Sequence, residues 1–65
     1  MKTKYEKAVK VLEGFKGKTM GVQALKRIVM RNLGSDERTI EGYLMTMRET
    51  KLITEVENMR FLINE

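Results

Sequence analysis

The apolar positions in the first part of the chain repeat with the period of an α-helix. Side chains spaced by three and four positions share one helical face, and five apolar residues follow this spacing: Tyr5, Ala8, Val9, Leu12 and Phe15. Thr3 suits the N-cap, and Gly17 suits the position just beyond a helix, where a positive φ is common. The pattern predicts a first helix over residues 3–15.

Two more apolar stripes of helical period follow the interruption at "KGKTMG". The first stripe comprises Val22, Leu25, Ile28, Val29 and Leu33. The second stripe comprises Ile40, Tyr43, Leu44 and Met47. Gly34 ends the first of these helices, and Ser35 or Asp36 caps the next. The sequence predicts helices over about residues 21–33 and 36–50 joined by a tight turn, with a very short extended segment near residues 18–20.

The tail "KLITEVENMRFLINE" changes from the helical period to an alternating one, which is typical of strands. A two-residue turn at residues 57–58 predicts a hairpin of strands over residues 52–56 and 59–63. In this register Glu55 lies across from Arg60, a favourable pair of opposite charges. The apolar face of the predicted hairpin carries Leu52, Val56, Met59, Phe61 and Ile63, together with Thr54.

The composition argues against an enzyme or a metalloprotein. The 65 residues include no Cys and no His, the commonest thiol nucleophile, general base and zinc ligands. The five glycines lack the spacing of a phosphate-binding loop. A hydrophobic fraction of 42% and a charged fraction of 34% suit a globular chain. We expect a single domain over residues 1–65 with no catalytic residue, no metal and no cofactor.

The distribution of apolar residues also bears on location. No apolar run approaches the ~20 residues that a membrane span needs. The N-terminal residues alternate charged with apolar side chains, unlike the continuous apolar segment of a signal peptide. We therefore expect a cytoplasmic protein that does not cross a membrane, and the absence of Cys is compatible with a reducing compartment.

The charges divide unevenly along the chain. Residues 1–34 hold nine bases and two acids, for a charge of +7, whereas residues 35–65 hold four bases and seven acids, for −3. The two parts together give the net charge of +4. A basic part of this kind is typical of proteins that bind nucleic acid or an acidic partner, although lysine-rich helices also occur simply because they are soluble.

The order of the predicted elements is helix, short strand, helix, tight turn, helix and hairpin. Over about residues 5–63 it resembles the winged helix-turn-helix domain, an α+β fold, of small prokaryotic and archaeal transcription regulators and their viral or plasmid counterparts. The residues that carry the resemblance are Leu33-Gly34, Arg38-Thr39-Ile40, Tyr43-Leu44 and Leu52-Ile53. Two features depart from the family pattern: Lys51 stands where glycine is common, and the third helix carries acids on its outer face.

The resemblance implies a sequence-specific protein that binds double-stranded DNA, with the third helix in the major groove and the second helix and wing on the backbone. Candidate base-reading residues are Arg38, Thr39, Glu41, Gly42, Met45 and Thr46. Candidate backbone contacts are Lys16, Lys18, Gln23, Arg27, Arg31 and Arg60, of which Arg60 also fits a pair with Glu55. The resemblance further implies a homodimer through the first helix. Tyr5 and Phe15 are candidates for its interface or, alternatively, for the core of the monomer.

Two other functions remain open from the sequence. The acids of the third helix, together with Met45 and Met30 outside the core stripes, favour a winged helix that binds a partner protein. The lysine-rich first helix favours a non-specific chromatin or plasmid-maintenance protein. Binding to duplex DNA, and its dependence on base sequence, separates the three alternatives.

Overall fold

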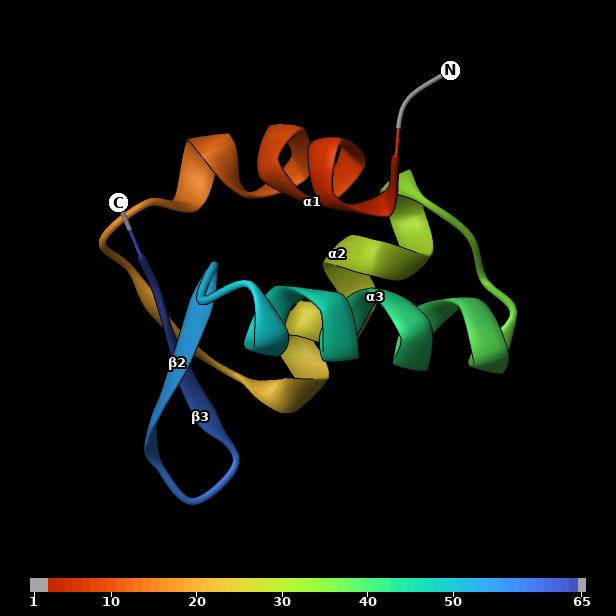
Figure 1. The fold of residues 1–65 in the computed structure, drawn as a ribbon. Helices are drawn as coiled ribbons and strands as arrows, with labels where there is room; N and C mark the ends of the chain where they lie inside the picture. Colours follow the sequence, from red (N-terminus) through yellow and green to blue (C-terminus); the bar gives the residue numbers. More distant parts are fainter. Residues whose placement is uncertain (1–2, 65) are drawn as a thin grey trace.

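The computed structural model describes residues 3–64 and contains three helices followed by a C-terminal hairpin (Figure 1). In chain order the elements are α1 (Lys4–Leu12), the 3-10 turn η1 (Glu13–Phe15), β1 (Thr19–Gly21), α2 (Val22–Asn32), α3 (Glu37–Glu49), β2 (Ile53–Glu57) and β3 (Arg60–Ile63). This order confirms the predicted α+β fold class, with the layout of a winged helix. The short β1 joins the hairpin in one antiparallel sheet.

Thr3 is the N-cap of α1, as predicted, and a capping box stabilises this end of the helix. The N–H of Glu6 donates to Thr3 Oγ1 (3.2 Å), and the Glu6 carboxylate accepts from the N–H of Thr3 (3.5 Å). These two bonds satisfy N–H groups that a helix N-terminus otherwise leaves unpaired. The α-helix ends at Leu12 and continues as η1, and Gly17 takes the expected positive φ of 81°.

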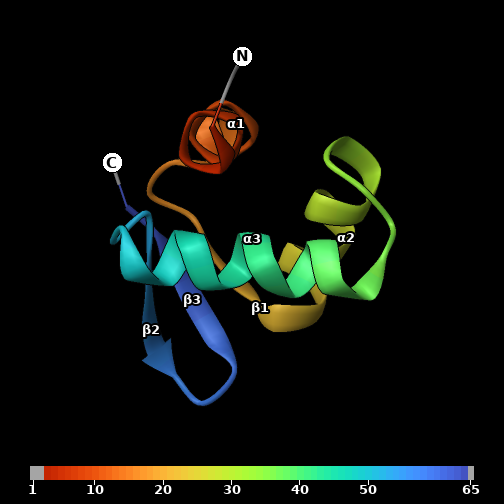
Figure 2. The same ribbon diagram turned by 45° about the vertical axis from the view of Figure 1, so that its right-hand side comes forward.

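The core lies where the three helices meet one face of the sheet. α3 runs between α1 and the hairpin, and α1 contacts both other helices (Figures 1 and 2). The buried side chains are Ala8, Leu12, Leu25, Val29, Ile40, Tyr43, Met47, Ile53, Phe61 and Ile63. The helical members belong to the stripes that the sequence predicts. Tyr5 belongs to the predicted apolar stripe of α1 but is not buried, because 46% of its surface is exposed.

A tight connection over residues 33–36 joins α2 to α3. The N–H groups of Leu33 and Gly34 both donate to the carbonyl oxygen of Val29, at 2.8 and 3.1 Å. A Cβ at Gly34 would lie 3.0 Å from Cγ2 of Thr39, so α3 begins close against the turn. Asp36 occupies the N-cap position, as one of the two predicted residues, but its side chain makes no capping hydrogen bond.

The hairpin register differs from the predicted one by a residue. Across the strands Ile53 lies opposite Ile63, Glu55 opposite Phe61, and Glu57 opposite Arg60, with an irregularity between Glu55 and Glu57. The predicted turn at residues 57–58 and the predicted Glu55–Arg60 pair are therefore wrong. The turn instead falls on residues 58–59.

The physical reason for the different register lies in which side chains reach the core. A shift of one residue moves a whole strand's side chains to the other face. The observed register buries Ile53, which the predicted one would have turned away from the core. Val56 and Met59, which we expected on the apolar face, are 49% and 54% exposed. Met59 also has the left-handed φ of 63° that the turn requires.

The end of α3 is unusual in its backbone. Lys51 has a φ of 65°, its N–H donates to the carbonyl of Arg48 (3.2 Å), and the N–H of Leu52 donates to that of Met47 (2.9 Å). These two bonds form the Schellman pattern that ends many helices, in which glycine normally occupies the left-handed position. Lys51 thus adopts, with a Cβ, the left-handed conformation that glycine usually takes at this position.

Replacing Lys51 by glycine is expected to raise the free energy of unfolding by about 1 kcal/mol, because a residue with a Cβ is strained in the left-handed region. Lys51→Ala keeps the Cβ and removes the same charge, so it serves as the matched control and is expected to give no such gain. Urea denaturation followed by circular dichroism measures both. Equal stabilities of the two variants would show that the left-handed conformation carries no strain.

Candidate functional site

One side of α3 lies open at the surface between two neighbouring elements. The helix crosses the molecule with the hairpin on one side of it and α2 behind it (Figure 2). Glu41, Met45 and Glu49 are spaced by four residues, so they form a row along this open side, and all three are exposed. Arg38 is exposed one turn earlier in the helix. The open side thus combines a base near the helix start with an acid–methionine–acid row along its length.

The six candidate base-reading residues separate into two groups. Arg38, Glu41 and Met45 are exposed, whereas Thr39, Gly42 and Thr46 are half-buried. The hydroxyl of Thr46 donates to the carbonyl of Gly42 within the helix (3.0 Å).

Gly42 faces α1 rather than open solvent. A Cβ at Gly42 would lie 2.9 Å from Lys4 Nζ, and this ammonium group lies 5.8 Å from the centre of the Tyr43 ring. The Lys4 side chain therefore occupies the space beside Gly42, a candidate base-reading residue. Arg38, Glu41 and Met45 are thus the candidates on α3 whose side chains are exposed.

The exposed side of α2 meets the start of α3 along a shallow groove of about 360 Å³. Gln23 and Arg27, two of the predicted backbone contacts, line this groove together with Lys26, Met30 and Glu41. Lys26 also lines the groove but was not among the residues predicted from the sequence. It lies three residues after Gln23 and four before Met30, and this spacing places the three side chains along one side of α2.

The structure places three other predicted backbone contacts away from this groove. The backbone of Lys18 accepts a hydrogen bond from the N–H of Ile63 (2.8 Å), so Lys16 and Lys18 lie near the end of β3, opposite the hairpin turn. Arg31 is exposed in the last turn of α2 and does not line the groove. Lys16, Lys18 and Arg31 are therefore not brought together with the open side of α3.

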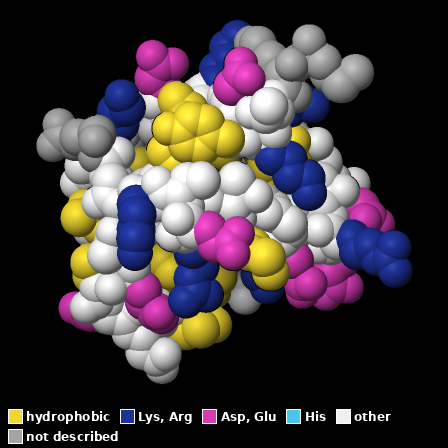
Figure 3. All heavy atoms as spheres, viewed as in Figure 1, with side chains coloured by type: hydrophobic (Ala, Val, Ile, Leu, Met, Phe, Trp, Pro, Cys, Tyr) yellow, Lys and Arg dark blue, Asp and Glu magenta, His cyan; other side chains and the backbone are white. Residues whose placement is uncertain are grey.

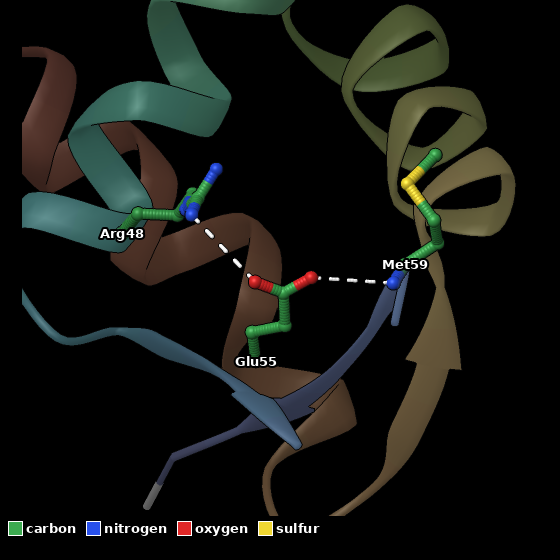
Figure 4. Close-up of polar contacts among 3 residues, drawn as sticks. All are labelled: Arg48, Glu55 and Met59. Atoms are coloured by element: carbon green, nitrogen blue, oxygen red, sulfur yellow. Dashed lines mark hydrogen bonds and ion pairs between the residues drawn. The ribbon is translucent and has the colours of Figure 1, made fainter. Parts of the chain in front are cut away.

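A cluster around Glu55 connects α3 to the hairpin (Figure 4). Glu55 Oε1 lies 3.8 Å from Arg48 Nη2, and Oε2 accepts a hydrogen bond from the N–H of Met59 (3.2 Å). The Arg48 guanidinium carbon also lies 5.7 Å from the centre of the Phe61 ring. The ion pair is well exposed, so it contributes little free energy, ~0.2–1 kcal/mol. Glu55 therefore lies between α3 and the turn of the hairpin, with one carboxylate oxygen directed to each.

The observed register leaves Arg60 without its predicted partner. Glu55, across from which we expected Arg60, is engaged by Arg48 instead. Arg60 is exposed and forms no ion pair with any other residue in the range 3–64. Arg60 lies opposite Glu57 at the start of β3, next to the hairpin turn, and its guanidinium is accessible at the surface.

The face that carries α3 and the hairpin is electrostatically mixed. Lys and Arg side chains alternate with Asp, Glu and apolar side chains over this face, and no continuous basic area appears there (Figure 3). The exposed apolar side chains include Met45 on α3 and Val56 and Met59 on the hairpin. Neutralisation of a polyanion by this face would depend on a few individual bases rather than on a broad basic surface.

The two candidate interface residues of a homodimer differ in exposure. Tyr5 is exposed on α1, whereas Phe15 is half-buried and packs against the core. The side chain of Tyr5 is thus accessible to a second molecule. Much of the Phe15 side chain instead packs within the monomer.

None of the three helices in residues 3–64 is both long enough and apolar enough to cross a membrane. No model of a protein family, no curated protein and no solved structure matches the chain.

Proposed function

We propose that this protein binds double-stranded DNA in a sequence-dependent manner and acts as a transcription regulator. The observation that carries the proposal is the open side of α3, flanked by α2 along one edge and by the hairpin along the other. The major groove of B-DNA admits a single α-helix, and helix-turn-helix proteins place the helix after the turn there. The 13 residues of α3 give a helix about 20 Å long, enough to cross the groove.

Base recognition is assigned to the exposed residues in the first half of α3. Arg38 lies in the second helical position, where the N-terminal residues of a recognition helix meet base edges. Its guanidinium matches the two acceptors of guanine. Glu41 follows one turn later and accepts from the amino group of cytosine, the base edge to which a carboxylate is suited.

Contacts to phosphate are assigned to the residues that flank α3. Lys26 and Arg27 supply positive charge on the α2 side, with Gln23 as a neutral donor, and Arg60 supplies it on the hairpin. The N–H of Val22 donates to the carbonyl of Met59 (2.9 Å), which keeps the hairpin turn next to the start of α2. The three bases are therefore held around α3 on elements that are tied together.

A homodimer in the cytoplasm completes the proposal. So few phosphate contacts predict weak binding by one domain, and a dimer that reads two half-sites about one helical turn apart compensates for this. Tyr5, exposed on α1, is the assigned dimer contact.

The decisive experiment is selection of duplexes from a random pool with the purified protein at two salt concentrations. We expect enrichment of sequences that contain guanine and cytosine close together, with the pair repeated about ten base pairs apart if the protein dimerises. Three phosphate-contacting bases per protomer predict a slope of about −2.7 per protomer in a plot of log affinity against log salt. No binding to any duplex at low salt contradicts the proposal, and binding without sequence enrichment supports a non-specific DNA-binding protein instead.

A further inference from the structure

An open groove of about 670 Å³ lies between the second half of α3 and the start of β2. Its apolar lining comes from Leu44, Met45 and Ile53. Met45 is the most exposed of these, at 60%. A groove that combines an apolar lining with an exposed, conformationally adaptable methionine is typical of surfaces that accept side chains of another protein.

The charges around this groove sum to −1. Glu41 and Glu49 line it from α3 and Glu55 lines it from β2, against two bases, Arg48 and Lys51. Arg48 is already engaged by Glu55 and lies over the ring of Phe61. The carboxylates of Glu41 and Glu49 form no ion pair within residues 3–64. A phosphate group would be repelled here, whereas a lysine or arginine side chain would be attracted.

The row of Glu41, Met45 and Glu49 specifies the shape of the matching ligand. Successive members are one helical turn apart, or ~5–6 Å, so the two carboxylates lie on either side of the methionine. Two basic side chains with an aliphatic side chain between them match this row in both charge and polarity. An amphipathic helix with a four-residue spacing presents side chains in this way.

We propose that the α3–β2 groove docks a basic amphipathic segment of a partner protein, in which an aliphatic side chain packs against Met45 and flanking Lys or Arg side chains pair with Glu41 and Glu49. This docking does not depend on DNA binding. The two proposed ligands share one residue, because Glu41 is assigned a base contact and also lines the groove, so a duplex and the docked segment compete for it.

The proposal is tested with protein carrying carbon-13 at the methionine methyl groups. The probe is a short synthetic peptide with leucines between lysines at four-residue spacing. Two further peptides replace its lysines by glutamate or its leucines by serine. We expect the lysine–leucine peptide to shift the Met45 methyl signal saturably, while the signals of Met30 and Met59, both exposed elsewhere, stay in place. Equal shifts from the glutamate or serine peptide would overturn the proposal.

A matched pair of double variants separates specific pairing from bulk charge. Glu41→Gln with Glu49→Gln removes the two groove carboxylates and is expected to weaken the peptide about tenfold, the effect of two exposed ion pairs. Glu37→Gln with Glu57→Gln makes the same change in net charge outside the groove lining and is expected to leave the affinity unchanged. An unchanged buried Met47 signal verifies folding in both variants. Equal weakening in both variants overturns the proposal.

Duplex DNA supplies the remaining arm of the test. If a duplex shifts the Met45 signal and binds more tightly to the Glu41→Gln, Glu49→Gln variant, the groove receives a DNA backbone and the docking proposal is wrong. If a duplex leaves Met45 unshifted while the peptide shifts it, docking is supported. If the protein binds no duplex, the DNA-binding proposal is wrong, but the peptide result still supports or contradicts docking. The two proposals can therefore be tested independently.

Discussion

Met47→Ala is expected to lower the free energy of unfolding by about 2–5 kcal/mol, whereas Met45→Ala changes it by less than about 0.5 kcal/mol. The two residues have the same type and lie two positions apart in α3. Met47 is fully buried in the core, at 0% exposure, and Met45 is 60% exposed. Truncating Met47 removes contacts and leaves a cavity, while truncating Met45 removes a side chain that mostly faces water.

The size of the chain makes the first of these effects decisive. At about 0.05–0.15 kcal/mol per residue, a chain of 65 residues has a total stability of only about 3–10 kcal/mol. The Met47→Ala variant is therefore expected to lose a large share of its stability, with a urea midpoint lower by about 1 M or more. Circular dichroism during urea denaturation of both variants measures the difference. Equal midpoints would mean that α3 does not pack in the observed orientation.

Arg38→Ala is expected to reduce discrimination at one base pair of the selected duplex by about 1–3 kcal/mol, or roughly 5- to 150-fold. Arg27→Ala removes the same charge from α2 and is expected to weaken all duplexes alike, with a salt slope smaller by about 0.9. The difference arises because base edges carry sequence information and phosphates do not. Titration of the selected duplex and of its single-base variants, at several salt concentrations, separates the two effects.

Lys10→Ala provides the control for charge alone. Lys10 lies on α1 beside Asn32 and Leu33, outside both grooves of α3, and loses the same unit of charge. It is expected to change neither discrimination nor the salt slope. If Arg38→Ala behaves like Arg27→Ala, Arg38 contacts the backbone and base recognition must be sought elsewhere on α3.

The helices were predictable from the sequence because their apolar residues are repeated every three to four positions over long stretches. The start of α1 was equally readable, since Thr3 carries a side chain suited to capping and the structure confirms that role. The start of α3 was readable only to within two residues, and neither Ser35 nor Asp36 forms a side-chain cap. Local chemistry thus predicted the elements better than their connections.

The hairpin register was not predictable in the same way. An alternating pattern identifies strands, but it leaves the pairing open to a shift of one residue. Here the turn relies on Met59 in a left-handed conformation and on an irregularity beside Val56, neither of which has a strong sequence signal. The burial of Ile53 against the helices, a property of the assembled fold, decides the register.

The candidate site was predicted in part for a related reason. The periodicity of α3 separates its core side from its outer side, and it correctly placed Arg38, Glu41 and Met45 on the outside. The periodicity of one helix does not show which side chains from other helices lie over its outer side. Lys4 from α1 reaches Gly42, and Lys26 comes to line the groove beside α3, only because the helices cross as they do.

The order β1-β3-β2 makes β2 an edge strand, whose outer row of backbone groups has no partner strand within residues 3–64. Such an edge is a template for pairing with another molecule and hence for aggregation. The irregularity beside Val56 interrupts the regular pairing row, and Glu55 and Glu57 put negative charge on both sides of it. Two molecules that met edge to edge would find mismatched hydrogen bonds and opposed carboxylates. The hairpin irregularity thereby favours a protein that stays dispersed at high concentration.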